Sequence, residues 1–296
     1  MGTGRTRPST ASRSGSSASC FGLIGANGAG KTTLLRILAT LMRPLAGTAT
    51  IDGHDVVAAR REVRRRIGYM PERYTLYPEL TLEELLDYTA ASYGLRRREK
   101  QRRVGEALEM VGLGSRRRSS CAELSHGMKQ RAFLARALVH DPAVLLLDEP
   151  SSGLDPMARV ELRRVLGDLT RIGKTIVISS HVLPELEETC DTVAILGKGR
   201  VVAAGAVADL RCAGAAGHET VVEVDGGSGP AEAVLRECPG VVAVEAVGGT
   251  LHVRHTGKDA FHEMLRALVL AGIRVTSLGD RPGSLEQRLM EVSDAA

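Results

Sequence analysis

Apolar and polar positions follow two different periods along the chain, and each period predicts a different kind of element. Continuous apolar runs in AVLLLDEP (143–150) and TIVISS (175–180) are typical of parallel strands covered on both faces. The short apolar run CFGLI (20–24), ended by glycines, predicts a buried strand. KTTLLRILATLM (31–42) instead repeats apolar residues at helical spacing, which predicts an amphipathic helix that Pro44 terminates. Strands that alternate with helices in this way predict an α/β core.

Turn and capping residues predict shorter elements between these strands. TATIDGHDV (48–56) predicts a strand pair with a tight Asp-Gly turn, and VAILGKGRVVAAG (193–205) predicts a hairpin that turns at Gly-Lys-Gly. The segment from about 80 to 127 is mostly helical in pattern. Its first helix has Thr81 as a plausible N-cap and Glu84 three residues later, which together predict a capping box.

The chain divides into three sections by composition and spacing. Residues 1–19 are a low-complexity tail that we expect to be disordered, 20–215 form the α/β domain, and 218–296 form a second, smaller domain. For the last section the pattern predicts, in order, strand 220–225, helix 230–237, strand 241–246, strand 250–255, helix 258–271, strand 273–278 and helix 284–292. The βαββαβ order at its start predicts an α+β sandwich of the ferredoxin-like type.

Composition excludes several classes of protein. The 296 residues are 43% hydrophobic with a net charge of only +4, and aromatic residues make up 3% with no Trp, so we expect no nucleic-acid partner. The longest apolar runs fall short of the ~20 residues that span a bilayer. Five widely spaced cysteines without a CxxC pair favour thiols in a reducing compartment over a disulfide framework or zinc site.

A phosphate-binding loop follows the first strand. GANGAGKT (25–32) fits the pattern G-x-x-x-x-G-K-[ST] and opens the first helix, so backbone amides point at a phosphate. Lys31 is placed to reach the β- and γ-phosphates, and the Thr32 hydroxyl to ligate Mg²⁺. The predicted nucleotide-binding residues are Gly25, Ala26, Asn27, Gly28, Ala29, Gly30, Lys31, Thr32 and Thr33.

The acidic pair after a later strand supplies the second half of such a site. In VLLLDEP the strand places Asp148 at its carboxyl end, where the carboxylate can hold the magnesium shell. Glu149 comes next and is placed to polarise a water in line with the γ-phosphate. An acidic pair after a strand can also merely cap the next element, but the phosphate-binding loop makes the catalytic role the stronger prediction.

Five motifs in succession resemble those of the ATPase subunits of ATP-binding-cassette (ABC) transporters. After the phosphate loop come IGYMPE (67–72), LSHGMKQR (124–131), LLLDEPSSGLDP (145–156) and SSH (179–181). The resemblance covers residues 20 to about 210. It implies a P-loop ATPase domain with a mixed, largely parallel sheet and a helical subdomain, which binds ATP and Mg²⁺.

The resemblance also implies roles for individual residues. Ser125 and Gly127 would contact the γ-phosphate of ATP held by the other subunit, and Asp155 would cross the same interface. His181 would hydrogen-bond the γ-phosphate and hold the attacking water, although a polar residue there can also cap a helix. Glu72 stands where the family usually has a glutamine that senses magnesium and couples to the membrane subunit.

This chain departs from the family pattern in three places. His126 and Met128 replace the third and fifth residues of Leu-Ser-Gly-Gly-Gln, while the two phosphate contacts remain. Glu72 adds a negative charge near a triphosphate, which should weaken binding unless Mg²⁺ is present. The family normally begins about twenty residues earlier, with antiparallel strands and an aromatic that stacks on adenine. Residues 1–19 contain neither, and stacking of this kind contributes ~1–3 kcal/mol.

Basic runs lie at 61–66, 94–103 and 114–120. The ordinary interpretation is a solvated helix face, and the sharper one is contact with a membrane subunit or anionic headgroups. Tyr74 and Tyr77 are better candidates for binding the coupling helix of a membrane partner, or they pack inside the helical subdomain.

These features predict an ATP-hydrolysing subunit at the cytoplasmic face of the membrane. It would dimerise on ATP, as a homodimer or paralogous heterodimer, and drive a separate integral membrane permease. With one cassette and a small C-terminal domain, it resembles the exporter branch that handles drug-like or lipophilic cargo. One alternative is a truncated nucleotide-binding or assembly subunit that does not hydrolyse ATP. A cassette ATPase acting on ribosomes or DNA is disfavoured because it would be expected to carry two cassettes or a long coiled coil.

Overall fold

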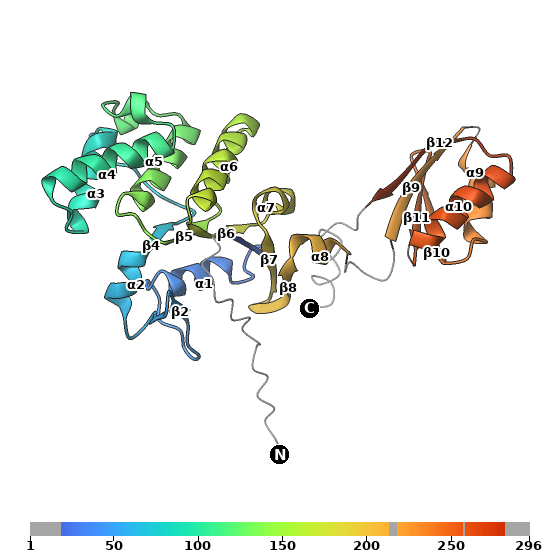
Figure 1. Ribbon diagram of the computed structural model, residues 1–296, viewed down its shortest axis with the longest axis horizontal. Coiled ribbons are helices and arrows are strands. Elements are labelled where there is room, and N and C mark those ends of the chain that lie inside the picture. Colours follow the sequence, from blue (N-terminus) through green and yellow to red (C-terminus); the bar gives the residue numbers. More distant parts are fainter. Residues whose placement is uncertain (1–18, 213–217, 226, 257, 282–296) are drawn as a thin grey trace, which may run out of the picture. The chain divides into compact units, whose positions relative to one another are not determined.

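The computed structural model describes residues 19–212, 218–225, 227–256 and 258–281 (Figure 1). Contacts divide the chain into two units, the first comprising Met1–Phe21 and Thr32–Ser179 and the second Gly22–Lys31 and Ser180–Ala296. The larger sheet contains β1 (Cys20–Ile24), β4 (Ile67–Met70), β5 (Val144–Asp148), β6 (Thr175–Ser180), β7 (Thr192–Gly197) and β8 (Arg200–Ala206). The helices up to residue 212 are α1 (Lys31–Leu38), α2 (Arg60–Arg66), α3 (Leu82–Ser92), α4 (Arg97–Met110), α5 (His126–Leu138), α6 (Pro156–Arg171), α7 (Leu183–Thr189) and α8 (Val207–Cys212), with 3-10 turns η1 (Gly114–Arg116) and η2 (Cys121–Glu123).

The larger sheet is mixed, with strand order β4-β5-β6-β1-β7-β8. Strands β4, β5 and β6 pair in parallel, with Leu145 opposite Gly68 on one side and Ile176 on the other. Strands β7 and β8 are antiparallel. The central residues of β5 are buried, as a strand covered on both faces requires. The parallel strands expected from the continuous apolar runs are therefore confirmed, and so is the 193–205 hairpin.

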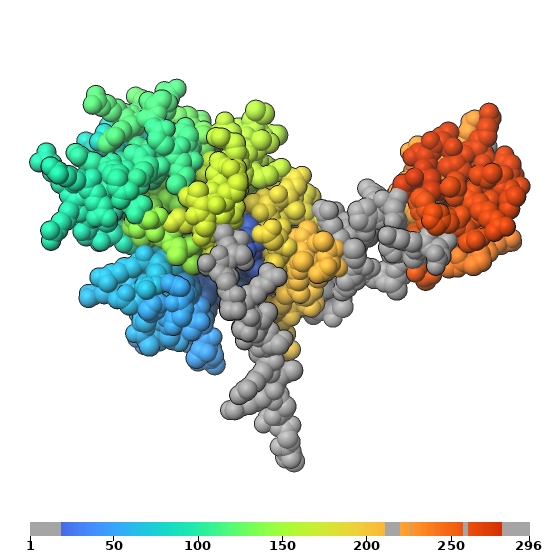
Figure 2. Space-filling model, in the orientation of Figure 1, coloured from blue at the N-terminus to red at the C-terminus, as the bar shows by residue number. Residues whose placement is uncertain are grey.

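Helices α3, α4 and α5 pack against one another within the first unit, and Figure 2 shows their surfaces as one continuous body. The predicted capping box is present: Thr81 Oγ1 accepts from the Glu84 amide at 3.2 Å, and the Glu84 carboxylate accepts from the Thr81 amide at 2.8 Å. The cap fixes the start of α3, which buries Leu82, Leu85 and Leu86.

The first helix ends earlier than its apolar pattern predicts. The expected helix ran to residue 42, but α1 stops at Leu38, and Leu41 is 59% exposed rather than buried. Thr40 adopts a left-handed conformation with φ 61°, and the Leu41 amide donates to the Arg36 carbonyl at 2.9 Å. This is the hydrogen-bond pattern that closes many helices, with threonine where glycine is usual. The prediction that Pro44 terminates the helix is wrong.

The last part of the chain forms a four-stranded antiparallel sheet with two helices on one side (Figure 1). Its elements are β9 (His218–Val224), α9 (Ser228–Arg236), β10 (Val241–Val247), β11 (Thr250–His255), α10 (Lys258–Leu270) and β12 (Val275–Arg281). The strand order is β10-β11-β9-β12. Fully buried side chains of the sheet and helices, including Val222, Leu251 and Met264, make one core. The expected helix 284–292 and the tail up to residue 18 lie outside the described residues.

A short hairpin completes the fold. Strands β2 (Thr50–Ile51) and β3 (His54–Asp55) pair as a hairpin with positive φ at Asp52 and Gly53, which confirms the predicted turn. In the part of the chain that the structure describes, no helix has the length and apolar character to cross a bilayer.

Candidate functional site

The loop between β1 and α1 has the backbone that a phosphate cradle needs. Gly28 and Gly30 have φ of +83° and +103°, a region that favours glycine. Gly25 is fixed by packing instead, because a Cβ there would lie 2.4 Å from the carbonyl oxygen of Leu196 on β7. The Gly199 amide donates to the Ala29 carbonyl at 3.0 Å, which holds the loop to the β7–β8 turn. The loop is therefore shaped by its own glycines and by β7.

Lys31 opens α1 and is only 6% exposed. Its Nζ donates to the Gly25 carbonyl at 2.6 Å and lies 3.4 Å from the Ala26 carbonyl, so the ammonium lies over the loop rather than out in solvent. An ammonium group in this position can contact a phosphate that the loop amides bind. Of the other predicted loop residues, Asn27 and Thr33 are exposed.

Thr32 and Asp148 meet although 116 positions separate them in the sequence. Thr32 Oγ1 donates to Asp148 Oδ1 at 3.2 Å, and Ser179 Oγ donates to the same oxygen at 2.7 Å. The other carboxylate oxygen, Asp148 Oδ2, is buried without a hydrogen-bond partner among the described residues. A buried unsatisfied carboxylate oxygen is costly unless something binds it. A hydroxyl beside a carboxylate is the oxygen set that Mg²⁺ prefers, so these residues fit that ion.

The backbone of Glu149 is held by Ser179 of the neighbouring strand β6. Its amide donates to Ser179 Oγ at 3.0 Å and to the Ser179 carbonyl at 3.2 Å. Its φ is 48°, a left-handed conformation that is uncommon outside glycine. Glu149 is 8% exposed. A strained backbone conformation of this kind persists only where the surrounding contacts hold it in place, and such conformations are concentrated at functional sites.

Ser125 and Asp155 each cap a helix and remain exposed. Ser125 Oγ accepts from the Met128 amide at 3.3 Å at the start of α5, and Asp155 Oδ1 accepts from the Ala158 amide at 2.8 Å at the start of α6. Gly127 lies where α5 approaches α6, since a Cβ there would be 2.9 Å from the Ala158 Cβ. In the described part of the chain, no contact joins these three residues to Thr32 or Asp148.

Glu72 and His181 both follow strands of the larger sheet. Glu72 is exposed two residues after β4, and His181 is exposed immediately after β6. The N-cap of the next helix, α7, is Val182, whose amide donates to Ser180 Oγ at 2.9 Å. The N-cap position of α7 is thus Val182 rather than His181, and the role of His181 at the phosphate stays a prediction.

Comparisons with known proteins agree with this geometry. A family model described as "ABC transporter" matches residues 11–152. "Nod factor export ATP-binding protein I" of Burkholderia pseudomallei (strain 1710b) is 36% identical over 281 residues, which cover 93% of this chain and 88% of the relative. The chain belongs to the ABC transporter ATP-binding proteins.

Other relatives of this ABC protein match over different lengths. An uncharacterized ABC transporter ATP-binding protein of Nostoc sp. (strain PCC 7120) is 35% identical over 269 residues, 90% of this chain and 77% of the relative. A second, from Synechocystis sp. (strain PCC 6803), is 41% identical over 192 residues, which are 64% of this chain but only 54% of the relative. A solved "ATP binding subunit of ABC transporter" superposes with a TM-score of 0.58 at 38% identity over 65% of this chain and 80% of its own. The agreement supports the P-loop ATPase fold.

Sequence reasoning gave no role to two residues of the ABC protein's site region, although both lie inside motifs that carry the family resemblance. Ser179 joins Asp148 to the Glu149 backbone, and both its place at the end of an apolar strand and its place in SSH (179–181) pointed to it. Gln130 of α5 is 3% exposed; it accepts from the Tyr74 hydroxyl and donates to the Pro150 carbonyl. Burial raises the pKa of Tyr74 to about 12, so its hydroxyl stays protonated and donates. A glutamine inside an amphipathic helix pattern gave no distinct signal.

Proposed function

We propose that this protein is the ATP-hydrolysing subunit of an exporter. Two copies, or one copy and a paralogue, would bind ATP with Mg²⁺ between them at the cytoplasmic face of a membrane. Hydrolysis would drive a separate integral membrane permease, and no nucleic acid takes part. The observation that carries the proposal is the Thr32–Asp148–Ser179 cluster, with its unsatisfied Asp148 Oδ2 beside the constrained Glu149.

Each residue has a distinct role in this proposal. Lys31 and the loop amides would hold the phosphates, and Thr32 and Asp148 would hold Mg²⁺, an ion that would supply charge neutralisation at the phosphate oxygens. Glu149 accepts a proton from the attacking water, and Ser179 keeps its backbone in place. His181 holds that water.

Ser125, Gly127 and Asp155 would complete the ATP site of the other subunit. Ser125 and Gly127 would contact its γ-phosphate, and Asp155 would connect the two sites. Support comes from their positions at the exposed N-termini of α5 and α6, where backbone amides favour anions. Glu72 would accept a hydrogen bond from a magnesium-bound water.

Cargo and domain organisation are proposed by similarity. Relatives named as Nod factor export proteins support export, and we infer a drug-like or lipophilic substrate for the permease. We keep 20–215 as the ATPase domain and 218–296 as a ferredoxin-like domain, because βαββαβ with the order β10-β11-β9-β12 is the topology expected of that fold.

Glu149→Gln tests the proposed function. The variant should bind ATP but hydrolyse it at least ~100-fold more slowly, because it lacks the general base, and should accumulate as an ATP-bound dimer in size-exclusion chromatography. Glu79→Gln, at an exposed acid outside the site, is the matched control and should hydrolyse ATP normally. Wild-type hydrolysis by Glu149→Gln would show that the base is assigned wrongly.

The alternative is a nucleotide-binding or assembly subunit without turnover. It is favoured by the absence of an adenine-stacking aromatic in residues 1–19. Fluorescent ATP-analogue binding combined with a thermal melt of the full chain separates the two functions. Nucleotide binding with no phosphate release by the wild type would favour the alternative.

A further inference from the structure

Helix α5 begins with a residue to which the proposed function gives no role. His126 is its first residue, and it stands between Ser125 and Gly127, which would contact ATP held by the other subunit. The ABC family usually has glycine at this position, so the imidazole is a departure of this chain from the family pattern. The side chain is exposed, yet its ring contacts its own subunit rather than extending into solvent.

The His126 ring lies against the loop between β5 and α6. Its Nε2 donates to the Ser152 carbonyl at 3.4 Å. A Cβ at Gly153 would lie only 3.2 Å from the same nitrogen, so the ring and the glycine backbone are in close contact. Gly153 has a φ of +71°, a left-handed conformation that favours glycine. The loop therefore leaves room for the ring and presents a carbonyl to it.

A second donor of α5 reaches the same loop one turn later. The side-chain nitrogen of Gln130 donates to the Pro150 carbonyl. His126 and Gln130 lie on one face of α5, because residues four positions apart are about one helical turn apart. Their acceptors, at 150 and 152, are two positions apart in the loop. The start of α5 thus holds this loop at two carbonyls, through one buried donor and one exposed donor.

The loop that these donors hold begins with Glu149, the proposed base. The Ser152 amide donates to the Glu149 carbonyl at 3.1 Å, which closes a four-residue turn over 149–152. The backbone of Ser152 is therefore bonded on both sides, through its amide to Glu149 and through its carbonyl to His126. A change at His126 acts on the backbone of the base through a single peptide unit.

Apolar packing brings α5 close to this loop without fixing the orientation of its peptides. A Cβ at Gly127 would lie 2.9 Å from the Ala158 Cβ and 3.8 Å from Leu154 Cδ2. These contacts limit how far α5 can move toward α6, but apolar contacts have no preferred direction. A hydrogen bond does have one, so the bond from His126 restrains the direction in which the Ser152 carbonyl points.

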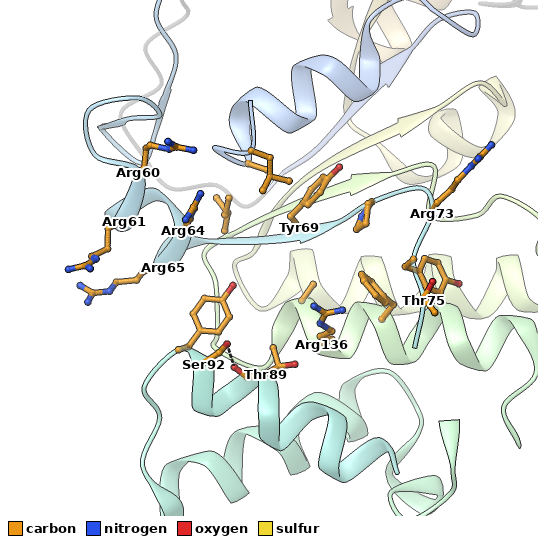
Figure 3. Close-up of a pocket in the computed structure, with 18 residues that line it drawn as sticks. Arg60, Arg61, Arg64, Arg65, Tyr69, Arg73, Thr75, Thr89, Ser92 and Arg136 are labelled. Atoms are coloured by element: carbon orange, nitrogen blue, oxygen red, sulfur yellow. Dashed lines mark hydrogen bonds between the residues drawn. The ribbon is translucent and has the colours of Figure 1, made fainter. Parts of the chain in front are cut away.

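This contact is separate from the large hollow of the first unit. That hollow has a volume of about 950 Å³, and the residues of α5 that line it are Phe133, Arg136 and Ala137 (Figure 3). His126 is not one of its lining residues and precedes Phe133 by about two helical turns. The hollow and the His126 contact thus occupy different stretches of the same helix.

We propose that His126 is a positioning residue for ATP hydrolysis, one that holds the 149–152 turn and so keeps Glu149 directed at the attacking water. The proposal rests on the proposed function, in which Glu149 is the base and Ser125 contacts ATP held by the other subunit. Because His126 adjoins Ser125, ATP of the other subunit also restrains the His126 contact and, through Ser152, the base. In the free subunit water competes for this exposed bond. A second subunit that covers it excludes that water and strengthens the bond.

Steady-state ATP hydrolysis by the full chain tests the proposal. His126→Ala should lower kcat about fivefold, which corresponds to the loss of one hydrogen bond, and should leave the KM for ATP within about twofold. His126→Gln should restore kcat to within about twofold of wild type, because its amide nitrogen reaches about as far as Nε2 and can still donate. The matched control is His262→Ala, at an exposed histidine of α10, which should hydrolyse ATP as wild type does.

Three kinetic results would overturn the proposal. Unchanged kcat in His126→Ala would mean that the turn does not need the bond. Equal losses in His126→Ala and His126→Gln would mean that the donor is not what matters. A raised KM with unchanged kcat would make His126 a contact of the nucleotide instead of a residue that positions the base.

Hydrogen–deuterium exchange separates a failure of this proposal from a failure of the proposed function. In the nucleotide-free full chain, the Ser152 amide should exchange at least about twofold faster in His126→Ala than in wild type or His126→Gln, because the turn is held less firmly. Unchanged exchange overturns the positioning role even if wild type hydrolyses ATP. Faster exchange in a chain whose wild type does not hydrolyse ATP supports the contact and refutes the proposed function.

Discussion

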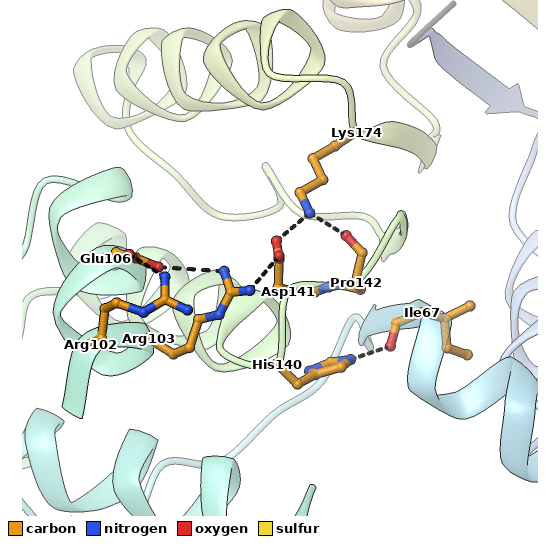
Figure 4. Close-up of polar contacts among 8 residues, drawn as sticks. All are labelled: Ile67, Arg102, Arg103, Glu106, His140, Asp141, Pro142 and Lys174. Carbon is orange, nitrogen blue, oxygen red and sulfur yellow. Dashed lines mark hydrogen bonds and ion pairs between the residues drawn. The ribbon is translucent and has the colours of Figure 1, made fainter. Parts of the chain in front are cut away.

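His140 makes the first unit sensitive to pH in a defined window. The ring lies just after α5, and its Nε2 donates to the Ile67 carbonyl at 2.8 Å (Figure 4). The ring also stacks on Tyr93 with centroids 3.7 Å apart. Burial, assisted by the Lys174 ammonium, lowers the pKa of His140 from 6.5 to about 4 against the opposing effects of the Ile67 carbonyl and Asp141. The folded chain therefore holds the ring neutral.

The sign and size of the effect follow from these two pKa values. Because the folded pKa is the lower one, the stabilisation is complete above pH 6.5 and is lost as the pH falls toward about 4. A tenfold difference in proton affinity between the folded and unfolded chains corresponds to about 1.4 kcal/mol, so about 2 kcal/mol is lost by about pH 5. Asp141, whose pKa is lowered by Lys174 and Arg103 despite its burial, loses its contribution only below 3.8 and does not enter this window.

Urea unfolding followed by circular dichroism at about pH 7.5 and about pH 5 measures this loss. His140→Gln is the matched variant, because its amide nitrogen reaches about as far as Nε2 and can still donate to the Ile67 carbonyl but does not titrate. We expect the wild type to lose about 2 kcal/mol more than the variant between the two pH values. Equal losses in both proteins would refute the conclusion that the ring is buried neutral.

Three further substitutions test single contacts. Gly25→Ala should abolish ATP-analogue binding and lower the melting temperature, because its Cβ would lie 2.4 Å from the Leu196 carbonyl oxygen. Its control is Gly105→Ala, which has open space in α4 and should stabilise the fold by up to about 1 kcal/mol. Unchanged binding and melting temperature in Gly25→Ala would contradict the tight approach of β7. Thr81→Ala should lower the free energy of unfolding, measured in urea, by about 1 kcal/mol, because α3 loses its side-chain cap. No change would mean that the cap does not contribute to stability. Gln130→Leu should cost about 2 kcal/mol by leaving buried polar groups unpaired and should slow ATP hydrolysis; unchanged hydrolysis would show that the link to Pro150 is not needed for turnover.

The parts of the fold that could be predicted are those determined by residues close together in the sequence. The continuous apolar run around Leu145–Leu147 is typical of a covered strand, and Thr81 with Glu84 forms its cap within a single turn. The phosphate loop is equally local, because the glycine conformations and the helix start lie within ten residues. Family resemblance then supplied roles for residues that local patterns alone leave unassigned, such as Ser125.

The parts that were missed depend on partners far away in the chain. The apolar pattern of α1 continues past residue 38, but the left-handed Thr40 ends the helix and is held by Arg60 and Arg64 of α2. The arginines of 61–66 looked like a solvated face, since nothing in the sequence places Arg136 opposite them. Tertiary packing determines both features, and the periodicity of apolar residues does not predict such contacts.

The strand order of the C-terminal domain has a consequence for how that domain folds. Strand β9 is its first strand, yet β9 lies between β11 and β12, the last two to be synthesised. During translation β9 has no neighbour to pair with until residue 250, and one edge stays open until Val275–Arg281 emerges. Pairing between strands so far apart in sequence is slow, and until it is complete the unpaired edge of β9 can pair with another chain. A ribosome that stalls before β12 should therefore release a chain prone to aggregation, although every residue of the ATP site is already made.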